Sequence, residues 1–592
     1  MKFNIIKELE QHLAQVFNAQ APEISVERPP ENFEGDITVN CFRLARDLRT
    51  NPMQIAEKAG EFCGGHSDVT NVEVVKAFVN VALNSAAVFR DAVADEKALM
   101  ADTLLPAAER RRIVIEFSAP NTNKPQHLGH VRNNSLGQAL VSILKKAGHD
   151  VIPVNLVNDR GIHICKSMLA YDRWGDGETP EVTGKKGDHF VGDYYVKFDQ
   201  ELKRQVNELR KAHPELIDKT DDELFLETEI GRATQEMLQA WENNDNKVRE
   251  LWRTMNSWVL AGFNKTYERM GVYFDKTYLE SETYGHGREL IEKHLDEGIF
   301  RRRDDGAVVI DLEKQNLGSK VVLRSDGTSV YVTQDIGTTV LKQETYNPDR
   351  QIWIVGDEQI YHFQVLFAIL KRLGCEWAEE LVHKPYGMVN LPSGRMKSRE
   401  GTVVDADNLF DEMENLARTA TLERVAEPPP DIDRRAKVIG MAALKFMLLK
   451  VNAKTTMMFD PEASVKFEGD TGPYLLYACA RIASMQRKAD NAALAGEVDW
   501  TTLGAPEEKD LALRCATYGE TVRQAARDLD TSNLATYLLE LAKSFSRFYR
   551  ECPVLAAPDQ KQVRARMELS RRVHRVLQDG LRTLTIETLE TM

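Results

Sequence analysis

The pattern of hydrophobic and polar positions divides the chain into regions with different predicted secondary structure. Residues 1–105 mix short helical patterns with glycine-containing turns. The β-rich run Ile-Val-Ile-Glu-Phe at 113–117 is followed by helical periodicity from Leu128 to Ala147. A second β-rich run covers 151–157, and a helix is expected to follow near Ile162. A strand, a helix and a second strand in this order are typical of a parallel, nucleotide-binding sheet.

The alternating pattern is interrupted once and then returns. Residues 176–305 carry long charged helical patterns rich in Glu, Lys and Trp, which predict a mainly helical insertion. A β-rich run at 351–355 and a helical pattern at 359–373 restore the alternation. Three consecutive prolines at 428–430 mark a boundary, and almost everything beyond them is helical up to Met592.

Chain length and these changes of pattern predict three domains. A chain of 592 residues is too long for a single hydrophobic core. We expect an N-terminal α+β module at 1–108, an α/β domain with a Rossmann-type parallel sheet at 109–426, and an all-α domain at 427–592. The apolar share of 42% and the charged share of 28% are ordinary for a globular protein. No apolar run approaches the about 20 residues that span a bilayer and no apolar signal region is present, so we expect a cytoplasmic protein without membrane contact.

Cysteine count and net charge limit the cofactors and partners. The seven cysteines are an odd number and no two have the short spacing of a zinc knuckle, so we expect reduced thiols, no zinc and no metal site. A net charge of −14 argues against a general nucleic-acid coat and against DNA as a partner. RNA binding through one basic face is still allowed, and local features must reveal it.

A histidine motif lies between the first predicted strand and its helix, where a parallel sheet binds ligands. In the run from Ser118 to His130, His127 and His130 are three residues apart and share one face at a helix start. Gly129 lets a ring or backbone approach closely, and the helix N-terminus favours phosphate. The motif predicts an ATP site, and the alternative is two helix-start histidines without a ligand.

A second motif, Ser-Gly-Arg-Met-Lys-Ser-Arg-Glu-Gly at 393–401, precedes a helix expected near Asp405. A loop with several cations can close over a triphosphate and stabilise charge on the leaving pyrophosphate. The alternative is a basic surface loop of the kind that many proteins have.

His127-Leu-Gly-His130 resembles the HIGH element of class I aminoacyl-tRNA synthetases and related nucleotidyltransferases, and the second motif is similar in placement to their KMSKS loop. The loop match is imperfect, because Ser398 occupies the position of the family's second lysine. Many arginyl members lack that lysine and carry one just before the HIGH element, where Lys124 stands here. We therefore expect Lys124 to supply positive charge to the ATP phosphates; a solvated loop lysine is the alternative. The resemblance further implies catalytic roles for His127, His130 and Lys397, and ATP contacts for Gly129, Arg395, Met396, Ser398 and Arg399.

A pocket for arginine needs carboxylates, because a guanidinium presents planar, forked donors. Three ordered elements resemble the arginyl-tRNA synthetase family: Glu-Phe-Ser-x-Pro-Asn at 116–121, Tyr-x-Thr-x-Asp-x-Gly at 331–337 and Gln-x-x-His-Phe at 359–363. The resemblance implies that Tyr331 and Asp335 hold the guanidinium. It also implies that three other residues orient the ammonium and carboxylate groups or complete the pocket: Glu116, Asn121 and Gln359. Taken alone, Tyr331 and Asp335 would indicate only an ordinary surface hydrogen bond.

Residues 467–481 combine aromatic and basic side chains at helical spacing. Tyr474, Tyr477 and Arg481 share a helical face, and rings and guanidinium planes suit unstacked RNA bases. The run resembles the element that opens the anticodon-binding domain of the arginyl family, and the chain end at Met592 also matches that domain. A second basic stretch at 561–575 is either a solvated helix or a further RNA face.

The N-terminal region resembles the module with which arginyl enzymes contact the outer corner of tRNA. It offers Asn40 and Phe42 as candidates, and a turn and helix start without RNA contact is the alternative. The whole resemblance implies a monomeric enzyme that converts L-arginine and Mg·ATP into arginyl-adenylate and transfers arginine to the 3′ end of tRNA(Arg). The first step is expected to need bound tRNA.

Three alternatives stay open. A class I synthetase for another amino acid is disfavoured by the cysteine spacing and the paired acids. A HIGH-type adenylyltransferase that acts without RNA would not need the helical C-terminal region. A non-catalytic RNA-binding or scaffold protein should have eroded nucleotide motifs, whereas His127, Gly129 and His130 are intact.

Overall fold

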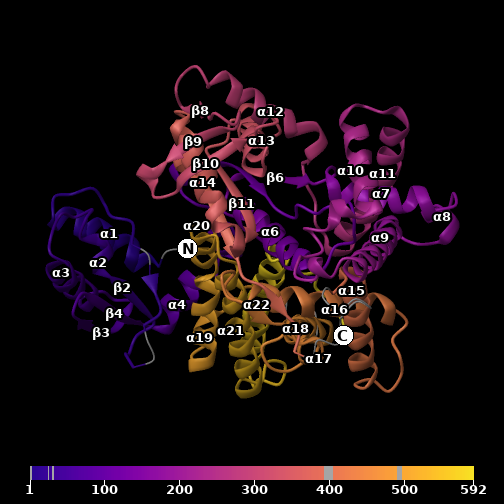
Figure 1. The fold of residues 1–592 in the computed structure, drawn as a ribbon. Helices are drawn as coiled ribbons and strands as arrows, with labels where there is room; N and C mark the ends of the chain where they lie inside the picture. Colours follow the sequence, from indigo (N-terminus) through magenta and orange to yellow (C-terminus); the bar gives the residue numbers. More distant parts are fainter. Residues whose placement is uncertain (1–2, 25, 30–31, 393–403, 490–495) are drawn as a thin grey trace.

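A five-stranded sheet, parallel throughout, lies at the centre of the largest domain (Figure 1). The computed structural model describes residues 3–24, 26–29, 32–392, 404–489 and 496–592. In spatial order the strands are β12 (Leu381–Tyr386), β11 (Arg350–Gly356), β5 (Arg112–Glu116), β6 (Asp150–Val157) and β7 (Lys276–Leu279). From β5 the chain passes to β6 on one side of that strand, and it later returns to form β11 on the other side of β5. This reversal creates a crevice at the carboxyl ends of β5 and β11, which is where sheets of this kind bind ligands.

Burial on both faces explains why β5 is a central strand. Ile113 and Ile115 pack into the main core, whereas Val114 packs on the opposite face with Val154 and Tyr278. Such an apolar run is typical of a parallel strand covered on both sides. Four helices lie where the sequence predicts them: α6 (Leu128–Lys146), α7 (Ile162–Trp174), α14 (Ile360–Arg372) and, after the second motif, α15 (Ala406–Leu422). A further helix, α13 (Tyr331–Tyr346), precedes β11. The predicted Rossmann-type α/β architecture is therefore confirmed.

The insertion forms a helical layer beside this sheet, shown in magenta in Figure 1. It contains α8 (Pro180–Thr183), α9 (Gly187–Ala212), α10 (Glu229–Glu242) and α11 (Asn246–Met270). The sheet resumes at β7, so the helical part ends before the boundary at 305 that the sequence predicts. Only one of the four residues of β7, Tyr278, is buried, and so short a strand has no periodic signal of its own. Its place is set by parallel pairing with β6.

A small antiparallel sheet follows: β8 (Phe300–Arg302), β9 (Val308–Leu312) and β10 (Gly318–Leu323). Before it comes α12 (Glu280–Lys293), and α12 packs on α13 at very close range. A Cβ atom on Gly337 would lie 2.2 Å from the Gly287 nitrogen, and one on Gly287 would lie 1.7 Å from the Thr333 carbonyl oxygen. Only glycine permits this crossing. The crossing fixes the start of α13 beside the start of α12.

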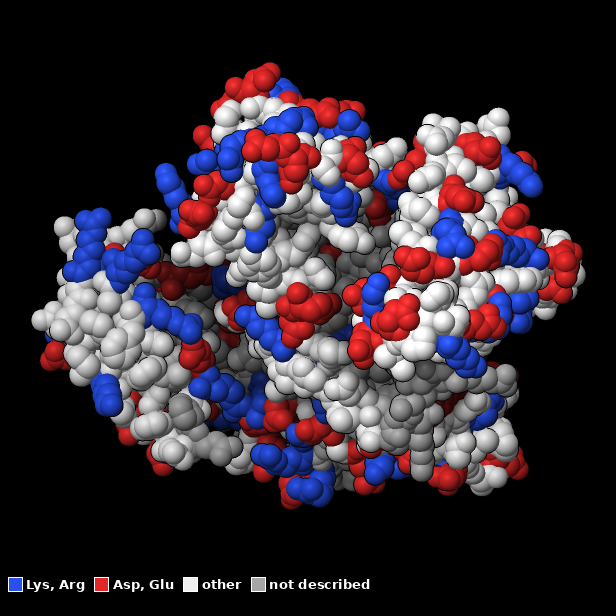
Figure 2. Space-filling view, viewed as in Figure 1, with Lys and Arg blue, Asp and Glu red and all other residues white. Residues whose placement is uncertain are grey.

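The N-terminal module has the predicted α+β character. Its four strands form an antiparallel sheet in the order β1 (Val26–Glu27), β2 (Ile37–Asn40), β4 (Phe78–Leu83) and β3 (Val69–Val75). Its helices are α1 (Asn4–Val16), α2 (Cys41–Leu44), α3 (Pro52–Gly64), α4 (Ser85–Ala92) and α5 (Glu96–Ala101). On the face shown in Figure 2, several Lys and Arg side chains stand out on this module, at the left of the view.

The C-terminal region is helical, as predicted. Its helices are α16 (Ile432–Leu449), α17 (Pro461–Ser464), α18 (Gly472–Lys488), α19 (Pro506–Ala516), α20 (Tyr518–Asp528), α21 (Thr531–Glu551) and α22 (Gln560–Thr583). The two-residue strand β14 (Met457–Met458) joins it to β13 (Val389–Asn390) of the α/β domain. Within the described residues, no helix is both long and apolar enough to cross a bilayer.

The basic stretch at 561–575 does not form a uniformly solvated face. Arg566 is only 8% exposed and forms a 2.7 Å ion pair with Glu508. Arg572, equally buried, donates to the Val93 carbonyl oxygen at 2.9 Å and pairs with Glu96. These arginines attach α22 to α19 and to the N-terminal module, and they are therefore structural cations.

Replacing Gly337 with alanine is expected to destabilise the protein by about 1–3 kcal/mol, because the new methyl group forces two helix backbones apart. Gly285→Ala on α12 is the matched control, since a Cβ atom there meets nothing within 4 Å. The control should be neutral or stabilising by up to about 1 kcal/mol. Urea unfolding followed by circular dichroism measures both values, and equal stability of the two variants would contradict the close crossing.

Candidate active site

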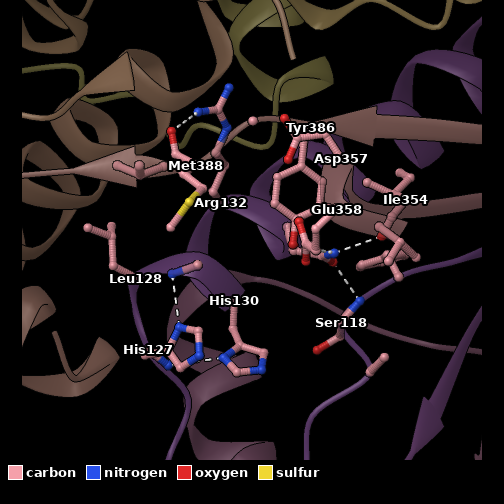
Figure 3. Close-up of a pocket in the computed structure, with 18 of the residues that line it drawn as sticks. Ser118, His127, Leu128, His130, Arg132, Ile354, Asp357, Glu358, Tyr386 and Met388 are labelled. Carbon is pink, nitrogen blue, oxygen red and sulfur yellow. Dashed lines mark hydrogen bonds between the residues drawn. The ribbon is translucent and has the colours of Figure 1, made fainter. Parts of the chain in front are cut away.

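A cavity of about 1000 Å³ opens at the carboxyl ends of β5, β11 and β12 (Figure 3). It lies at the order reversal of the sheet. Its walls come from residues 116–119 after β5, the start of α6, residues 354–358 at the end of β11, residues 386–391 and Val404, with Met458 from β14. The cavity therefore extends from the histidine motif to Val404, which follows the second motif, and to Met458 of the C-terminal region.

Asn133 ties the ends of three strands together below this cavity. Its Oδ1 accepts from the Ser118 backbone nitrogen at 2.6 Å. Its Nδ2 donates to the Ile354 carbonyl oxygen at 2.7 Å and to the Tyr386 hydroxyl at 3.2 Å. Asn133 is 4% exposed, so water cannot replace these bonds without rearrangement. The side chain thereby fixes β5, β11 and β12 relative to α6.

The backbone after β5 adopts an unusual conformation. Ser118 has φ 81° and Ala119 has φ 47°, a region that costs a non-glycine residue roughly 1–2 kcal/mol. Surrounding contacts maintain it. The Ala119 nitrogen donates to Asn155 Oδ1 at 3.0 Å, and the Ser118 hydroxyl lies 2.7 Å from the Tyr267 hydroxyl. This turn begins the loop that leads from β5 to the histidine motif.

His127 and His130 present the same kind of donor to the cavity. His127 Nδ1 accepts from the Gly129 nitrogen at 3.1 Å, and His130 Nδ1 accepts from the His127 nitrogen at 3.2 Å. Burial, and then the charge of Lys124, lower the pKa of His127 to about 4. Burial also lowers the pKa of His130 well below its usual value, with smaller contributions from His127 and Lys124. Each ring is therefore neutral near pH 7 and carries its proton on Nε2, where it can donate to a ligand oxygen.

Five predicted residues of the second motif lie outside the described residues: Arg395, Met396, Lys397, Ser398 and Arg399. The segments on either side are described, and both contact the cavity region. Before the motif, β13 pairs in parallel with β14. After it, the Val404 carbonyl oxygen accepts from the Leu128 nitrogen at 2.8 Å, and the Ala406 nitrogen donates to the Gln126 carbonyl oxygen at 2.9 Å. The second flank is thus hydrogen-bonded directly to the histidine motif.

Arg132 connects the cavity to the C-terminal domain. Its guanidinium is fully buried and donates to the carbonyl oxygens of Met388 at 3.2 Å, Ala453 at 2.9 Å and Thr455 at 2.9 Å. These carbonyls belong to the segment before β13 and to the segment between α16 and β14. One side chain of α6 therefore holds both segments beside the histidine motif.

An ion-pair network attaches the insertion to the start of α15. Lys186 lies 2.6 Å from Asp407 and 2.9 Å from Asp188, and His189 lies 3.1 Å from Asp407. Arg269 of α11 reaches Asp407 at 3.4 Å. Asp188, His189 and Asp407 have ligand atoms close enough together for a cation. Lys186 pairs with both carboxylates and Arg269 adds a second cation at Asp407, so the residues fit an ion-pair network better than a metal site.

Three of the residues predicted to bind arginine lie outside the cavity lining: Tyr331, Asp335 and Gln359. Tyr331 is the first residue of α13 and is 70% exposed, and Asp335 lies one turn later. The Asp335 carboxylate is 2.6 Å from His362 Nε2. Gln359 ends the short 3₁₀ helix (Asp357–Gln359) before α14 and is exposed. Among the described residues, Glu116 lines the cavity, whereas Tyr331, Asp335 and Gln359 do not.

Glu116 already has a buried partner. Lys342 Nζ lies 2.8 Å from its Oε2, and the Lys342 side chain is 1% exposed and lies over the Trp353 ring. Lys342 is two turns after Asp335 on α13, and a contact across 226 residues leaves no sequence signal. Asn121 is exposed, and its backbone forms a parallel bridge with Asn158. A ligand ammonium at Glu116 would share that carboxylate with Lys342.

A further carboxyl group near Asp335 was not identified from the sequence. The pKa of Glu280 is raised to about 7, mainly by burial. The charge of Arg160 lowers this pKa, and the charges of Asp159 and Asp335 raise it. The crossing of α12 and α13 brings Glu280, the first residue of α12, close to Asp335. The group therefore combines two carboxyl groups, Tyr331 and His362.

The predicted RNA residues occupy different environments on α18. Arg481 donates to the Tyr477 hydroxyl at 3.0 Å and lies over the rings of Tyr477 and Tyr549, with centroid distances of 4.6 and 5.0 Å. Tyr549 of α21 was not singled out from the sequence. The Tyr474 hydroxyl is 3.0 Å from Ser546 Oγ and so bonds internally. Met592 packs against the core.

In the N-terminal module, the Asn40 side chain caps α2 by accepting from the Phe42 nitrogen. The Phe42 side chain is 54% exposed. Asn40 thus has a structural role of its own, whereas Phe42 presents an apolar ring at the surface.

Comparison with known families covers almost the entire chain. Residues 95–461 match the catalytic domain of class I tRNA synthetases of the arginine type, residues 475–592 match the DALR anticodon binding domain, and residues 4–83 match the arginyl tRNA synthetase N-terminal domain. An arginine–tRNA ligase from Parabacteroides distasonis is 42% identical, with 97% of this chain and 96% of that protein covered. One from Bacteroides thetaiotaomicron is also 42% identical, with 98% of both covered.

Solved structures give the same picture of the fold. The chain is similar to a Thermus thermophilus arginyl-tRNA synthetase with a TM-score of 0.81 and 26% identity, over 99% of this chain and 100% of that one. A Plasmodium falciparum arginyl-tRNA synthetase shares the fold with a TM-score of 0.75 at 17% identity, over 99% of both chains.

The hydrogen bonds at Nδ1 predict the tautomer and charge of both cavity histidines. Nitrogen-edited NMR of protein with ¹⁵N-labelled histidine should show His127 and His130 protonated at Nε2 and neutral at pH 7, because burial opposes their charged form and lowers the pKa of both. His127→Asn and His130→Asn variants assign the signals. Titration of either ring with a midpoint near 6.5, or protonation at Nδ1, would contradict this assignment.

Loss of the Asn133 side chain should damage both stability and nucleotide binding. Asn133→Ala leaves a buried nitrogen and a buried carbonyl oxygen without partners, which is expected to cost about 2–4 kcal/mol. The KM for ATP should rise as the strand ends separate. Asn246→Ala, at an exposed position on α11, is the control and should change neither property. An Asn133→Ala protein as stable as the control would refute the tether.

Proposed function

Because the chain belongs to the arginyl-tRNA synthetase family of class I aminoacyl-tRNA synthetases, we propose that its cavity forms arginyl-adenylate before arginine passes to tRNA. The chain is an arginine–tRNA ligase, which joins arginine to tRNA. One observation carries the proposal: two neutral imidazole donors at the start of α6 face a cavity at the order reversal of a parallel sheet. Such a site suits a nucleotide triphosphate.

The proposed nucleotide substrate is ATP in complex with Mg²⁺. The Nε2–H groups of His127 and His130 donate to phosphate oxygens, and Gly129 leaves room for the nucleotide. Lys124 lies close enough to both histidines to influence their pKa, so its charge reaches the same phosphates. The cations of the second motif, Arg395, Lys397 and Arg399, act on the same triphosphate, with Met396 and Ser398 as neighbours. Zinc has no role in the proposal.

Arginine occupies the group of residues beside the cavity. Its guanidinium lies against Tyr331 and Asp335, and Glu280 supplies a second carboxyl group. Glu116, Asn121 and Gln359 orient the ammonium and carboxylate ends or complete the pocket. The paired carboxylates accept the forked donors of the arginine guanidinium. Citrulline lacks the positive charge and lysine lacks the forked donors, so neither satisfies the site.

The reaction proceeds in two steps without a covalent enzyme intermediate. An oxygen of the arginine carboxylate attacks the α-phosphorus, the bond from that phosphorus to the bridging oxygen breaks, and pyrophosphate leaves. A hydroxyl of the terminal adenosine of tRNA then attacks the arginyl carbonyl, and AMP leaves. The protein acts by positioning the reactants and stabilising charge.

The tRNA is proposed to contact both terminal domains. Tyr477 and Arg481, joined by Tyr549, form the aromatic and cationic surface for bases of the anticodon loop. Tyr474, which bonds internally to Ser546, and Met592 are proposed as further tRNA contacts of this domain. At the other end, Phe42 and the neighbouring Asn40 belong to the surface for the outer corner of tRNA. We further propose that the protein acts as a monomer in the cytoplasm and contacts neither DNA nor membrane.

Activation is proposed to require bound tRNA. The contacts of Arg132 and the β13–β14 pairing support this proposal, because they connect the C-terminal domain to the cavity wall. ATP–pyrophosphate exchange with each amino acid in turn, with and without bulk tRNA, tests it. The expected result is exchange with arginine alone and only when tRNA is present. Exchange that runs fully without tRNA, or with another amino acid, would contradict the proposal.

Lys124→Ala is expected to lower arginine-dependent exchange by about 10²–10³-fold, the usual effect of removing one group that stabilises transition-state charge. Lys247→Ala, at an exposed position on α11, is the charge-matched control and should leave the rate unchanged. Steady-state kinetics in ATP separates a change in kcat from a change in KM. Exchange by Lys124→Ala at the control rate would assign the phosphate charge to other residues.

A further inference from the structure

His362 holds the carboxylate on which the proposed arginine site depends. It is the third residue of α14, and its Nε2 lies 2.6 Å from Asp335 Oδ2 on α13. The two side chains are 26% and 33% exposed, so the contact is shielded on one side and open to a ligand on the other. The sequence contains this histidine within Gln-x-x-His-Phe, yet none of the roles assigned above uses it.

The geometry leaves Asp335 free to accept further donors. A carboxylate has two oxygens with about four lone-pair sites. The bond from His362 occupies one site on Oδ2, so Oδ1 and the outer side of Oδ2 can receive the forked donors of a guanidinium. Fixing one oxygen also reduces the rotational freedom that arginine binding would otherwise have to remove.

The charge state of His362 determines how strongly Asp335 attracts a cationic ligand. A neutral imidazole donates its Nε2 proton and leaves the charge of Asp335 unbalanced. A doubly protonated imidazole neutralises that charge and repels a second cation. Hydrogen bonding to Asp335 raises the pKa of His362, against a smaller opposing effect of burial, so the switch lies at or above the ordinary histidine range.

Other ionisable groups surround the pair and must be considered with it. From α12 comes Glu280, and the charges of Asp335 and of Asp159 and Arg160, in the segment after β6, all act on it. Tyr331 begins the same helix as Asp335. On β12, His383 lies 3.1 Å from the Val355 carbonyl oxygen, and burial, with His362 as a minor cause, lowers its pKa.

We propose that His362 is a positioning and specificity-determining residue of the arginine site, which orients Asp335 toward the guanidinium when neutral and occupies that carboxylate in place of arginine when doubly protonated. The proposal rests on the proposed role of Asp335 as the guanidinium acceptor. The ligand selected in this way is a permanent cation with planar donors, and its binding displaces a proton from His362.

The direction of the pH effect follows from linkage. A bound guanidinium disfavours the charged form of His362, so arginine binding releases a proton wherever free His362 is protonated. Arginine affinity therefore rises as pH increases through the pKa of His362 in the free enzyme and levels off above it. Glu280 contributes in the same direction, because a guanidinium favours its ionised form. The contributions of His362 and Glu280 must be separated by mutation.

Four variants separate these contributions and test the acceptor. His362→Gln keeps an amide donor for Asp335 but cannot titrate, and His362→Ala removes the donor. Glu280→Gln removes the second titrating group and leaves His362 in place. Asp335→Asn tests the proposed acceptor itself. Thermal unfolding of each full-length variant establishes that it folds.

The measurement is isothermal titration of L-arginine into the full-length enzyme from pH 6 to 8.5, in buffers of different ionisation enthalpy. The dependence of the observed heat on the buffer gives the number of protons released. At pH 8, His362→Gln should bind arginine within about threefold of the parent, and His362→Ala about tenfold more weakly, the usual effect of losing a hydrogen bond to a charged group. Below the His362 pKa, proton release should be smaller in His362→Gln than in the parent.

The outcomes distinguish this inference from the proposed arginine site. Unchanged arginine binding by Asp335→Asn would remove Asp335 as the acceptor, and both proposals would fall. Weak binding by Asp335→Asn together with full proton release by His362→Gln would overturn only the role of His362. Loss of all proton release in Glu280→Gln, with none lost in His362→Gln, would likewise assign the linkage to Glu280 and overturn the inference.

Discussion

The hydrogen bonds of Asn133 are the interaction on which the active site depends most. One buried amide connects the carboxyl ends of β5, β11 and β12 to the helix that carries the two histidines. The left-handed backbone at Ser118 and Ala119 is costly in isolation and persists because this amide and Asn155 hold it. Without these contacts the strand ends would be held only by pairing within the sheet, and the Asn133 link between them and α6 would be lost.

The charges around the site separate into two regions. The cavity presents neutral imidazole donors, and the cation Lys124 lies close enough to lower the pKa of both rings; these groups suit phosphate oxygens. The adjacent group presents the carboxyl groups of Asp335 and Glu280, which suit a guanidinium. Buried charges between the regions are paired, as in the ion pair of Glu116 with Lys342. A pairing of this kind limits the cost of burial and preserves the separation of the two ligands.

The elements with local signals could be predicted from the sequence, and those decided by distant contacts could not. The helix beginning at Leu128, the strand at 113–117 and the domain order were predicted, because periodicity and the histidine motif are local. The strand β7 was missed, because four residues among charged helices gain their place only from β6. The inward roles of Arg566 and Arg572 were missed for the same reason, since their partners lie 58 and 476 residues away. At the arginine group, Asp335 was predicted, but its partner His362 and its neighbour Glu280 were revealed only by the packing of α12, α13 and α14.

A crystal structure of the full-length protein with L-arginine and a non-hydrolysable ATP analogue is the most direct test of this active site. We expect phosphate oxygens within hydrogen-bonding distance of His127 Nε2 and His130 Nε2, and the guanidinium in contact with the Asp335 carboxylate while His362 still holds one of its oxygens. Arginine placed elsewhere, with Asp335 paired only to His362, or phosphates turned away from both histidines, would contradict it.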